Sequence, residues 1–225
     1  MLVHIPTIIA TCESFFAEFI SDAVDSFFSE LNLYIRHNED DMILDYANEQ
    51  TLCSLFVNGI IRNDSKKHTI TAVQEYGSYS KIDSRHGRTD LFMKVGDTGI
   101  WIEAKYDKYH ETLDKNHWNI ESWLQWDDKI FGQVMDYYNM EIDQVNPSYK
   151  EFYVMTLVFK KIREHADLVK DSANTELKIN STKDYVRPWY YSVGFFEYGN
   201  KDKVTGVEIY GTFKKMKNSM PNPIS

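Results

Sequence analysis

Three side chains near the middle of the chain are the strongest candidates for chemistry: Asp90, Glu103 and Lys105. Two carboxylates offer the hard oxygen ligands that Mg²⁺ prefers. A bound Mg²⁺ acidifies a coordinated water and neutralises charge that develops on a phosphoryl group. A lysine beside it can orient or deprotonate the attacking water. These residue types therefore suit the metal-assisted hydrolysis of a phosphodiester.

A predicted β-hairpin brings the three residues together. Residues 88–95 and 100–106 read as short strands, and residues 96–99 (Gly-Asp-Thr-Gly) have strong turn chemistry. With those four residues as the loop, Asp90 lies opposite Lys105. Since side chains alternate along a strand, all three charged groups share one face. A slip of one residue would separate them.

A structural interpretation competes with this one. A Glu-x-Lys pair is common on exposed strands, so Glu103 and Lys105 alone would favour a surface ion pair. Their strand, IWIEAKY, is otherwise apolar, and an aspartate meets them from the partner strand across a well-formed turn. This context favours a functional site.

The motifs also have a recognisable order. Residues 87–90 read Gly-Arg-Thr-Asp and, after twelve further residues, residues 103–105 read Glu-Ala-Lys. This arrangement resembles the PD-(D/E)XK nuclease superfamily, and in particular its RecB-like branch, whose first half often reads Gly-Arg-x-Asp. Threonine stands here in place of the proline, a variation that the superfamily tolerates.

Two helices add to the resemblance, which spans roughly residues 40–160. The RecB-like branch places a Gln-x-x-x-Tyr motif on the helix after the Glu-x-Lys strand, and Gln133 and Tyr137 match it. The superfamily also commonly draws a metal-site glutamate from an upstream helix. Glu49 fits this role, because it lies one turn before Leu52 on the predicted buried side of its helix.

The resemblance implies a role for each matching residue. The expected ligands of Mg²⁺ or Mn²⁺ are Glu49, Asp90, Glu103 and the carbonyl of Ala104. Lys105 is expected to serve the nucleophilic water. The residues expected to contact nucleic acid or support the site are Arg88, Gln133 and Tyr137.

The pattern of elements predicts an α/β protein. Apolar periodicity indicates helices at about 8–34, 40–62 and 122–140, a partly helical stretch at 163–185, and strands at 69–76, 88–95, 100–106, 151–160, 189–198 and 204–213. Residues 151–160 are the most apolar strand and are expected at the sheet centre.

The resemblance implies a restriction-endonuclease-like mixed central sheet flanked by helices. We expect one nuclease-like domain over residues 1–225, with a core at about 40–160. The helix at 8–34 and the C-terminal strands at 186–215 are expected elaborations.

Composition limits the classes of function. The net charge of −9 argues against a protein that coats DNA, which needs a broad basic surface, but it permits an enzyme with a local basic rim. One basic cluster, Lys160, Lys161 and Arg163, is expected to be a solvated face. The two cysteines show no metal-ligand spacing, and the chain shows neither a signal peptide nor a membrane span, so a cytoplasmic protein is expected.

Two functions from different classes follow. The first is a Mg²⁺-dependent deoxyribonuclease acting in repair, restriction or phage defence, with DNA as its partner. The alternative is a catalytically silent nuclease-fold module that acts through protein partners. A hydrolase of another phosphate ester is a third possibility, because the metal chemistry alone does not name the substrate. The strands after residue 185 are expected to serve homodimerisation or substrate selection.

Overall fold

The structure is a computed structural model of the chain. It describes residues 2–10, 14–38, 47–64, 70–79, 86–107, 128–136, 138, 149–165, 189–197 and 203–216.

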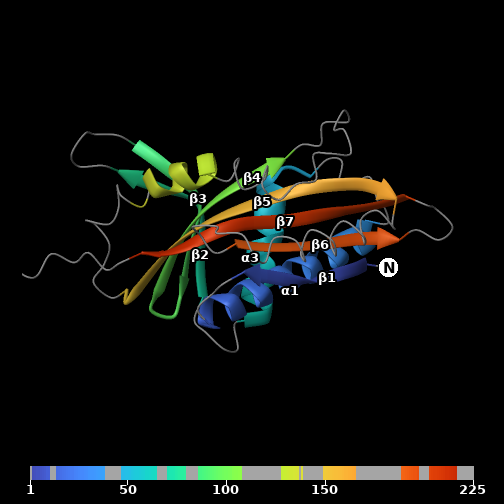
Figure 1. The fold of residues 1–225 in the computed structure, drawn as a ribbon, viewed down its shortest axis with the longest axis horizontal. Helices are drawn as coiled ribbons and strands as arrows, with labels where there is room; N and C mark the ends of the chain where they lie inside the picture. The colour runs from blue at the N-terminus through green and yellow to red at the C-terminus, as the bar shows by residue number, and fades with distance from the viewer. Residues whose placement is uncertain are drawn as a thin grey trace, which may run out of the picture.

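A mixed seven-stranded sheet organises the molecule (Figure 1). Its strands are β1 (Leu2–Ala10), β2 (Ile70–Tyr79), β3 (His86–Val95), β4 (Thr98–Asp107), β5 (Glu151–His165), β6 (Trp189–Glu197) and β7 (Lys203–Met216). They lie in the order β1-β6-β7-β5-β4-β3-β2. The β4–β5 pair is parallel and the other pairs are antiparallel. The chain is therefore an α/β protein, as predicted.

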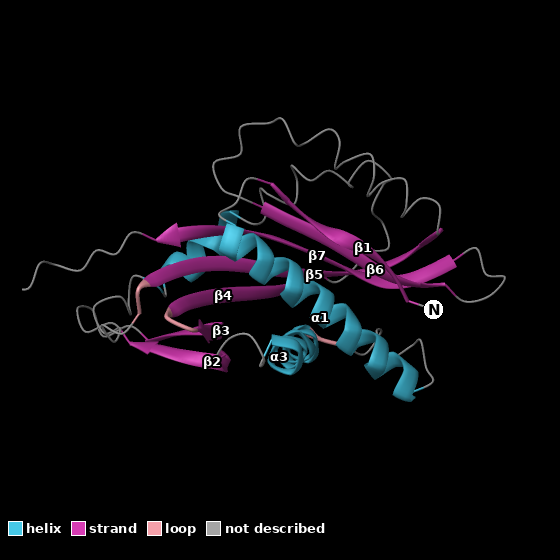
Figure 2. Cartoon of the chain, turned by 90° about the horizontal axis from the view of Figure 1, so that it is seen from below, coloured by secondary structure: helices cyan, strands magenta, loops and turns pink. Residues whose placement is uncertain are grey.

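Two helices cover one face of this sheet. In Figure 2, α1 (Ser14–Asn38) runs across the strands, with α3 (Glu49–Asp64) beside it. They cross closely at Gly59, where an added Cβ would lie 2.7 Å from the backbone carbon and oxygen of Ser26. The ring of Phe27 in α1 contacts the rings of Phe56 in α3 and Phe159 in β5. Aromatic packing thus joins both helices to the centre of the sheet.

Alternation along the strands divides the core between the two faces. Odd-numbered residues of β3 and even-numbered residues of β4, such as Met93 and Ile102, pack with α1 and α3. On the opposite face, Phe92 and Trp101 pack with Val134 and Tyr138 from the helical residues 128–136 and 138. Asp90, Glu103 and Lys105 have the same parity as this second set, so they belong to that opposite face.

The beginning of the chain differs from the prediction. A helix was expected over 8–34, but residues 2–10 form β1, which pairs with β6, and the helix begins at Ser14. The β1 segment is rich in β-branched residues, which favour strands. Its apolar side chains also occur at three- and four-residue steps, which mimics a helix.

Most of the remaining predicted elements are confirmed, with two differences among the described residues. The helix expected over 40–62 is α3, which begins only at Glu49, after the capping residue Asn48. Residues 163–165, expected in a partly helical stretch, instead extend β5 to His165. Strands β2 to β5 match the four central predictions, and β6 and β7 form the predicted antiparallel pair. β5 occupies the middle of the strand order, as expected. The predicted helix at 122–140 is described as helical at 128–136 and 138, whereas 39–46, 122–127 and 166–185 lie outside the described residues. No described helix is long and apolar enough to cross a membrane.

Candidate active site

The hairpin register is shifted by two residues from the predicted one. Lys94 pairs with Gly99 and Leu91 with Ile102, so continuing the register sets Asp90 opposite Glu103 rather than Lys105. The turn consists of Gly96 and Asp97, not of four residues, and Gly96 has a φ of 59°, which favours glycine. A two-residue shift leaves every side chain on its predicted face, because the side-chain period of a strand is two.

The sheet forks at this hairpin. Pairing between β3 and β4 ends at Leu91 and Ile102. Beyond that point β3 stays paired with β2 as far as His86, while β4 stays paired with β5 as far as Asp107. Among the described residues, one edge of β4 therefore has no strand neighbour from residue 103 onward.

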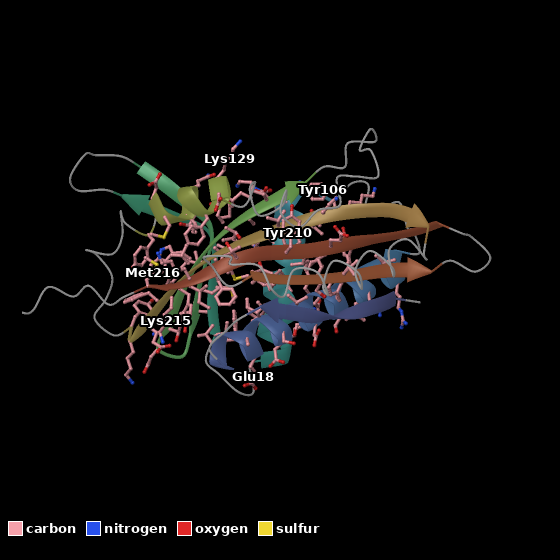
Figure 3. The ribbon with its side chains drawn as sticks, viewed as in Figure 1. Glu18, Tyr106, Lys129, Tyr210, Lys215 and Met216 are labelled. Atoms are coloured by element: carbon pink, nitrogen blue, oxygen red, sulfur yellow. The ribbon has the colours of Figure 1, made fainter. Side chains whose placement is uncertain are left out.

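Two carboxylates fill this open edge. The backbone N–H of Ala104 donates to Asp90 Oδ2 at 2.9 Å, and the N–H of Tyr106 donates to Glu49 Oε2 at 3.1 Å. Tyr106 lies near the end of β4 (Figure 3). Side-chain acceptors thus replace the missing strand at two successive outward-pointing amides, and Asp90 and Glu49 are both fixed against β4.

A helix cap places Glu49 at this position. Asn48 Oδ1 accepts hydrogen bonds from the N–H of Thr51 at 2.9 Å and from its hydroxyl at 3.0 Å. This is the usual geometry of an N-terminal cap, and it starts α3 at Glu49. Since α3 lies on the opposite face from Glu103, Glu49 meets β4 at the fork.

Lys105 joins the acidic groups. Its Nζ donates to Glu103 Oε1 at 2.7 Å, to the carbonyl of Ala104 at 2.8 Å and to Asp90 Oδ2 at 3.3 Å. The side chain of Glu103 is 1% exposed, whereas those of Asp90 and Lys105 are 27% and 28% exposed. The predicted convergence of Asp90, Glu103 and Lys105 is confirmed, with one edge of the cluster open to solvent.

Burial controls the electrostatics of the cluster. It raises the pKa of Glu103 to about 7, an effect that the charge of Asp90 increases and the hydrogen bond from Lys105 opposes. Burial also raises the pKa of Glu49. For Lys105 burial lowers the pKa, but the hydrogen bond and charge of Glu103, together with the charge of Asp90, outweigh it and the pKa rises above its ordinary value. Three carboxylates and one ammonium therefore form one coupled set.

One carboxylate oxygen of this set can still accept a hydrogen bond or bind a cation. Glu103 Oε2 is buried and, within the described part of the chain, has no hydrogen-bond partner. A buried carboxylate oxygen in that condition is costly and calls for a partner such as a cation or a water. A ligand at this position would offset the cost.

The donor types fit a magnesium ion, although the described residues contain no cluster of three or more His, Cys, Asp or Glu side chains able to hold a metal. Asp90 and Glu103 supply one carboxylate each, and Ala104 supplies a carbonyl that faces the same position. Hard oxygen donors with one or two protein carboxylates, completed by waters, are typical of Mg²⁺ sites. Glu49 is bonded to the N–H of Tyr106 and interacts with Asp90 through charge.

The other predicted site residues are less fully placed. Arg88 lies in β3 opposite Gly77, and its side chain is outside the described set. Gln133 is on the exposed side of helical residues 128–136, and Tyr137 is not among the described residues.

Sequence reasoning missed a polar network one strand from the site. Thr156 in β5 is the register partner of Glu103 and is fully buried. Its hydroxyl oxygen accepts the N–H of Thr212 at 2.8 Å, and its carbonyl accepts a hydrogen bond from Tyr190, which passes over Gly211. The sequence did contain a signal for this network, because Thr156 is a polar residue inside the apolar run EFYVMTLVFK.

One basic cluster was also interpreted wrongly. Lys160 and Lys161 were expected on a solvated face, but they are 2% and 9% exposed. Adjacent residues of a strand point to opposite faces, so both faces of β5 are still covered where these lysines follow the fully buried Phe159. Lys160 also lies directly across from the fully buried Glu208 in β7.

Comparisons with known proteins add no assignment, since no protein-family model, curated protein or solved structure matches the chain.

Proposed function

We propose that the protein is a Mg²⁺- or Mn²⁺-dependent nuclease that hydrolyses phosphodiester bonds in DNA. One observation carries this proposal: the oxygens of Asp90, Glu103 and Ala104 converge on a single cationic position at a fork in the sheet. These are three of the four groups that the PD-(D/E)XK resemblance expects to bind metal. The fourth, Glu49, lies at the same fork through its bond to Tyr106.

The fold also supports the proposal. A restriction-endonuclease-like core is expected to be a mixed sheet flanked by helices, and β2 to β5 with α3 and the helical residues 128–136 have this general form. The strands β1, β6 and β7 extend the sheet beyond β5. They would be additions to a nuclease core, available for substrate selection or pairing with a second copy.

Each residue of the cluster has a chemical task under this proposal. When bound, Mg²⁺ would supply an acidified water and neutralise charge on the phosphoryl oxygens. Asp90 and Glu103 would hold it, and Glu103 would have to be ionised to do so, which its pKa of about 7 permits at neutral pH and above. Asp90 is held in place by the N–H of Ala104. Lys105 is close enough to the carboxylates to orient the attacking water.

A silent nuclease-fold module is the second candidate, and the same cluster gives it support. The ammonium of Lys105 already neutralises part of the charge of Asp90 and Glu103, as a purely structural ion pair would. The net charge of −9 also suits a protein partner better than extended DNA contact. Turnover separates the two candidates.

The test is a cleavage assay with matched variants. We expect the purified protein to cut at least one of linear, circular or single-stranded DNA in Mg²⁺ or Mn²⁺, and to be inactive with a chelator. Asp90→Asn and Lys105→Ala should each lower the rate by about 100-fold or more, the usual size of such contributions. Lys94→Ala is the control, because Lys94 lies on β3 over the ring of Tyr149, away from the cluster. Cleavage of RNA alone would reassign the substrate. No cleavage, or equal cleavage by all variants, would refute the nuclease.

A further inference from the structure

We infer that Lys105 is a built-in competitor of the divalent cation, so that a cation can enter the cluster only by displacing the lysine ammonium. The inference rests on the metal-binding part of the proposed function. It goes beyond it by assigning Lys105 a second state, in which it blocks the site that it later serves.

The geometry around Nζ carries the inference. Its three acceptors are Asp90 Oδ2, Glu103 Oε1 and the carbonyl of Ala104, at 3.3, 2.7 and 2.8 Å. These are the same oxygens that are expected to bind the metal. An ammonium has three donors, and here all three are directed at the cluster. The ammonium of Lys105 therefore lies at the centre of these three oxygens rather than to one side of them.

Steric and electrostatic limits prevent joint occupancy. Mg²⁺ binds oxygen at about 2.0–2.1 Å in an octahedral shell. An ion held at that distance by the same three oxygens, Asp90 Oδ2, Glu103 Oε1 and the carbonyl of Ala104, would overlap the nitrogen of Lys105 where it now lies. The two cations would also repel each other strongly over so short a distance. Entry of the ion and withdrawal of Lys105 are thus one coupled event.

The Lys105 side chain has room to withdraw from the cluster, and its withdrawal would free its ammonium for a catalytic role. The side chain of Lys105 is 28% exposed, so one direction from the three oxygens leads to solvent. While its three hydrogen bonds persist, the ammonium has no donor left for an attacking water. The arriving cation would therefore both complete the site and release the lysine for catalysis, whereas the cation-free site stays partly neutralised by the lysine and inert.

The main experiment measures Mg²⁺ affinity by calorimetry, without substrate. The test variant is Lys105→Met, which keeps the length of the side chain and removes its charge and donors. The control is Lys94→Met, which makes the same change in net charge on the neighbouring strand. The titration is run at about pH 8.5, where carboxyl groups with a moderately raised pKa are ionised. We expect Lys105→Met to bind Mg²⁺ at least about tenfold more tightly than the parent, with Lys94→Met unchanged.

The outcomes are distinct. Equal or weaker binding by Lys105→Met, with measurable binding by the parent, would overturn the competition and leave the nuclease proposal intact. Equal tightening in both variants would also overturn it, since net charge alone would then explain the effect. No binding by any variant would overturn the competition and the metal-dependent nuclease together. Tighter binding by Lys105→Met in a protein that cuts no nucleic acid would support the competition and refute the nuclease.

A second measurement needs no variant. Amine acetylation of the native protein, with mass spectrometry at Lys105, should be slow without Mg²⁺ and several-fold faster at saturating Mg²⁺, because the ammonium leaves its acceptors. Lys94 in the same sample serves as the internal reference. Unchanged or slower labelling of Lys105 at saturating Mg²⁺ would count against displacement.

Discussion

Glu103 combines two unfavourable conditions, burial and a neighbouring carboxylate. Its side chain is 1% exposed, and the negative charge of Asp90 opposes its ionisation. The ammonium of Lys105 compensates only in part, which is why the pKa of Glu103 stays raised at about 7. A residue in this state makes the stability of the cation-free protein depend on pH.

The sign of that dependence follows from linkage. The folded-state pKa lies above the ordinary value of 4.5, so the folded protein binds the proton more tightly than the unfolded chain does. This contribution is fully present below about pH 4.5 and is lost as the pH rises through about 7. In Glu103→Gln the slope between these values should flatten, by roughly 1–3 kcal/mol over the interval.

Urea denaturation in chelator at several pH values measures this slope. Glu151→Gln is the control, because Glu151 is a more exposed carboxylate at the start of β5 that also pairs with a lysine, Lys215. If the parent and Glu103→Gln lose stability in parallel, Glu103 does not titrate in this range.

At the residue scale, the sequence predicted correctly which face the charged residues share, although it predicted the strand pairing wrongly. Alternation and the turn placed Asp90, Glu103 and Lys105 on one face, and the structure confirms their convergence. The pairing was wrong by two residues, because Gly96-Asp97-Thr98-Gly99 accommodates either a four-residue loop or a two-residue turn. Both choices preserve the face, so the site was predictable even though the pairing was not.

Among the elements, α3 links the candidate site to the packing of the helices. It carries Glu49 to the fork, and its crossing with α1 requires Gly59 against the backbone of Ser26. A cross-helix ion pair, Arg62 to Glu30 at 2.9 Å, holds the same crossing. The position of Glu49 is thus set by its cap at one end and by close packing further along.

Substituting Gly59 should show how far the α1–α3 crossing depends on the close approach of the two helices. In Gly59→Ala the new Cβ would lie 2.7 Å from backbone atoms that cannot rotate away, so the helices must separate. We expect a loss of about 1–3 kcal/mol in the free energy of unfolding, typical of overpacking. Gly132→Ala is the matched control: Gly132 lies in a helix, and its Cβ would meet nothing within 4 Å, so a gain of about 0.5–1 kcal/mol is expected.

Chemical denaturation of the three proteins decides the matter. Equal stability of the Gly59 and Gly132 variants would show that the α1–α3 crossing tolerates a wider spacing.

Elements with one clear period were predictable, and the others were not. The middle of β4 is apolar except at its charged pair, and β5 opens with an apolar run, so both strands were found. The polar end of β5, residues 161–165, lacks this pattern and was not predicted as strand. Residues 8–10 are apolar at every position, which fits the end of a strand as well as the start of the predicted helix. Only pairing with β6, a strand almost two hundred residues away, decides between them.

On the scale of the whole molecule, the strand order joins distant parts of the chain. β7 lies between β5 and β6, and β1 closes the far edge beside β6. Hydrophobic alternation identifies which face of a strand is buried but not which strand is its neighbour. The sequence therefore predicted a mixed sheet with β5 at its centre, and could not predict that the C-terminal strands are part of the same sheet.

Net charge gives a prediction at the same scale. With −9 overall, the protein should grip nucleic acid through few phosphate contacts. Measured in Ca²⁺ to prevent cleavage, the plot of log affinity against log salt should have a slope of about −2 to −4. Arg88→Ala should reduce its magnitude by about one unit and weaken all sequences alike.

Lys150→Ala is the control, since Lys150 is highly exposed and pairs with Asp97 at the turn of the hairpin, away from the fork. A slope steeper than about −6 would indicate an extended basic surface and contradict local contact.

The fork in the sheet has a consequence for solubility. An unpaired strand edge is a template on which another chain can add a strand and start aggregation. At Ala104 and Tyr106 that edge is closed by the carboxylates of Asp90 and Glu49. The acids of the candidate site thus also occupy the backbone donors that strand addition would use at these two positions. Apolar replacements there would free these donors and remove the chemistry together, whereas Asn and Gln keep an oxygen that accepts the backbone N–H and separate the two effects.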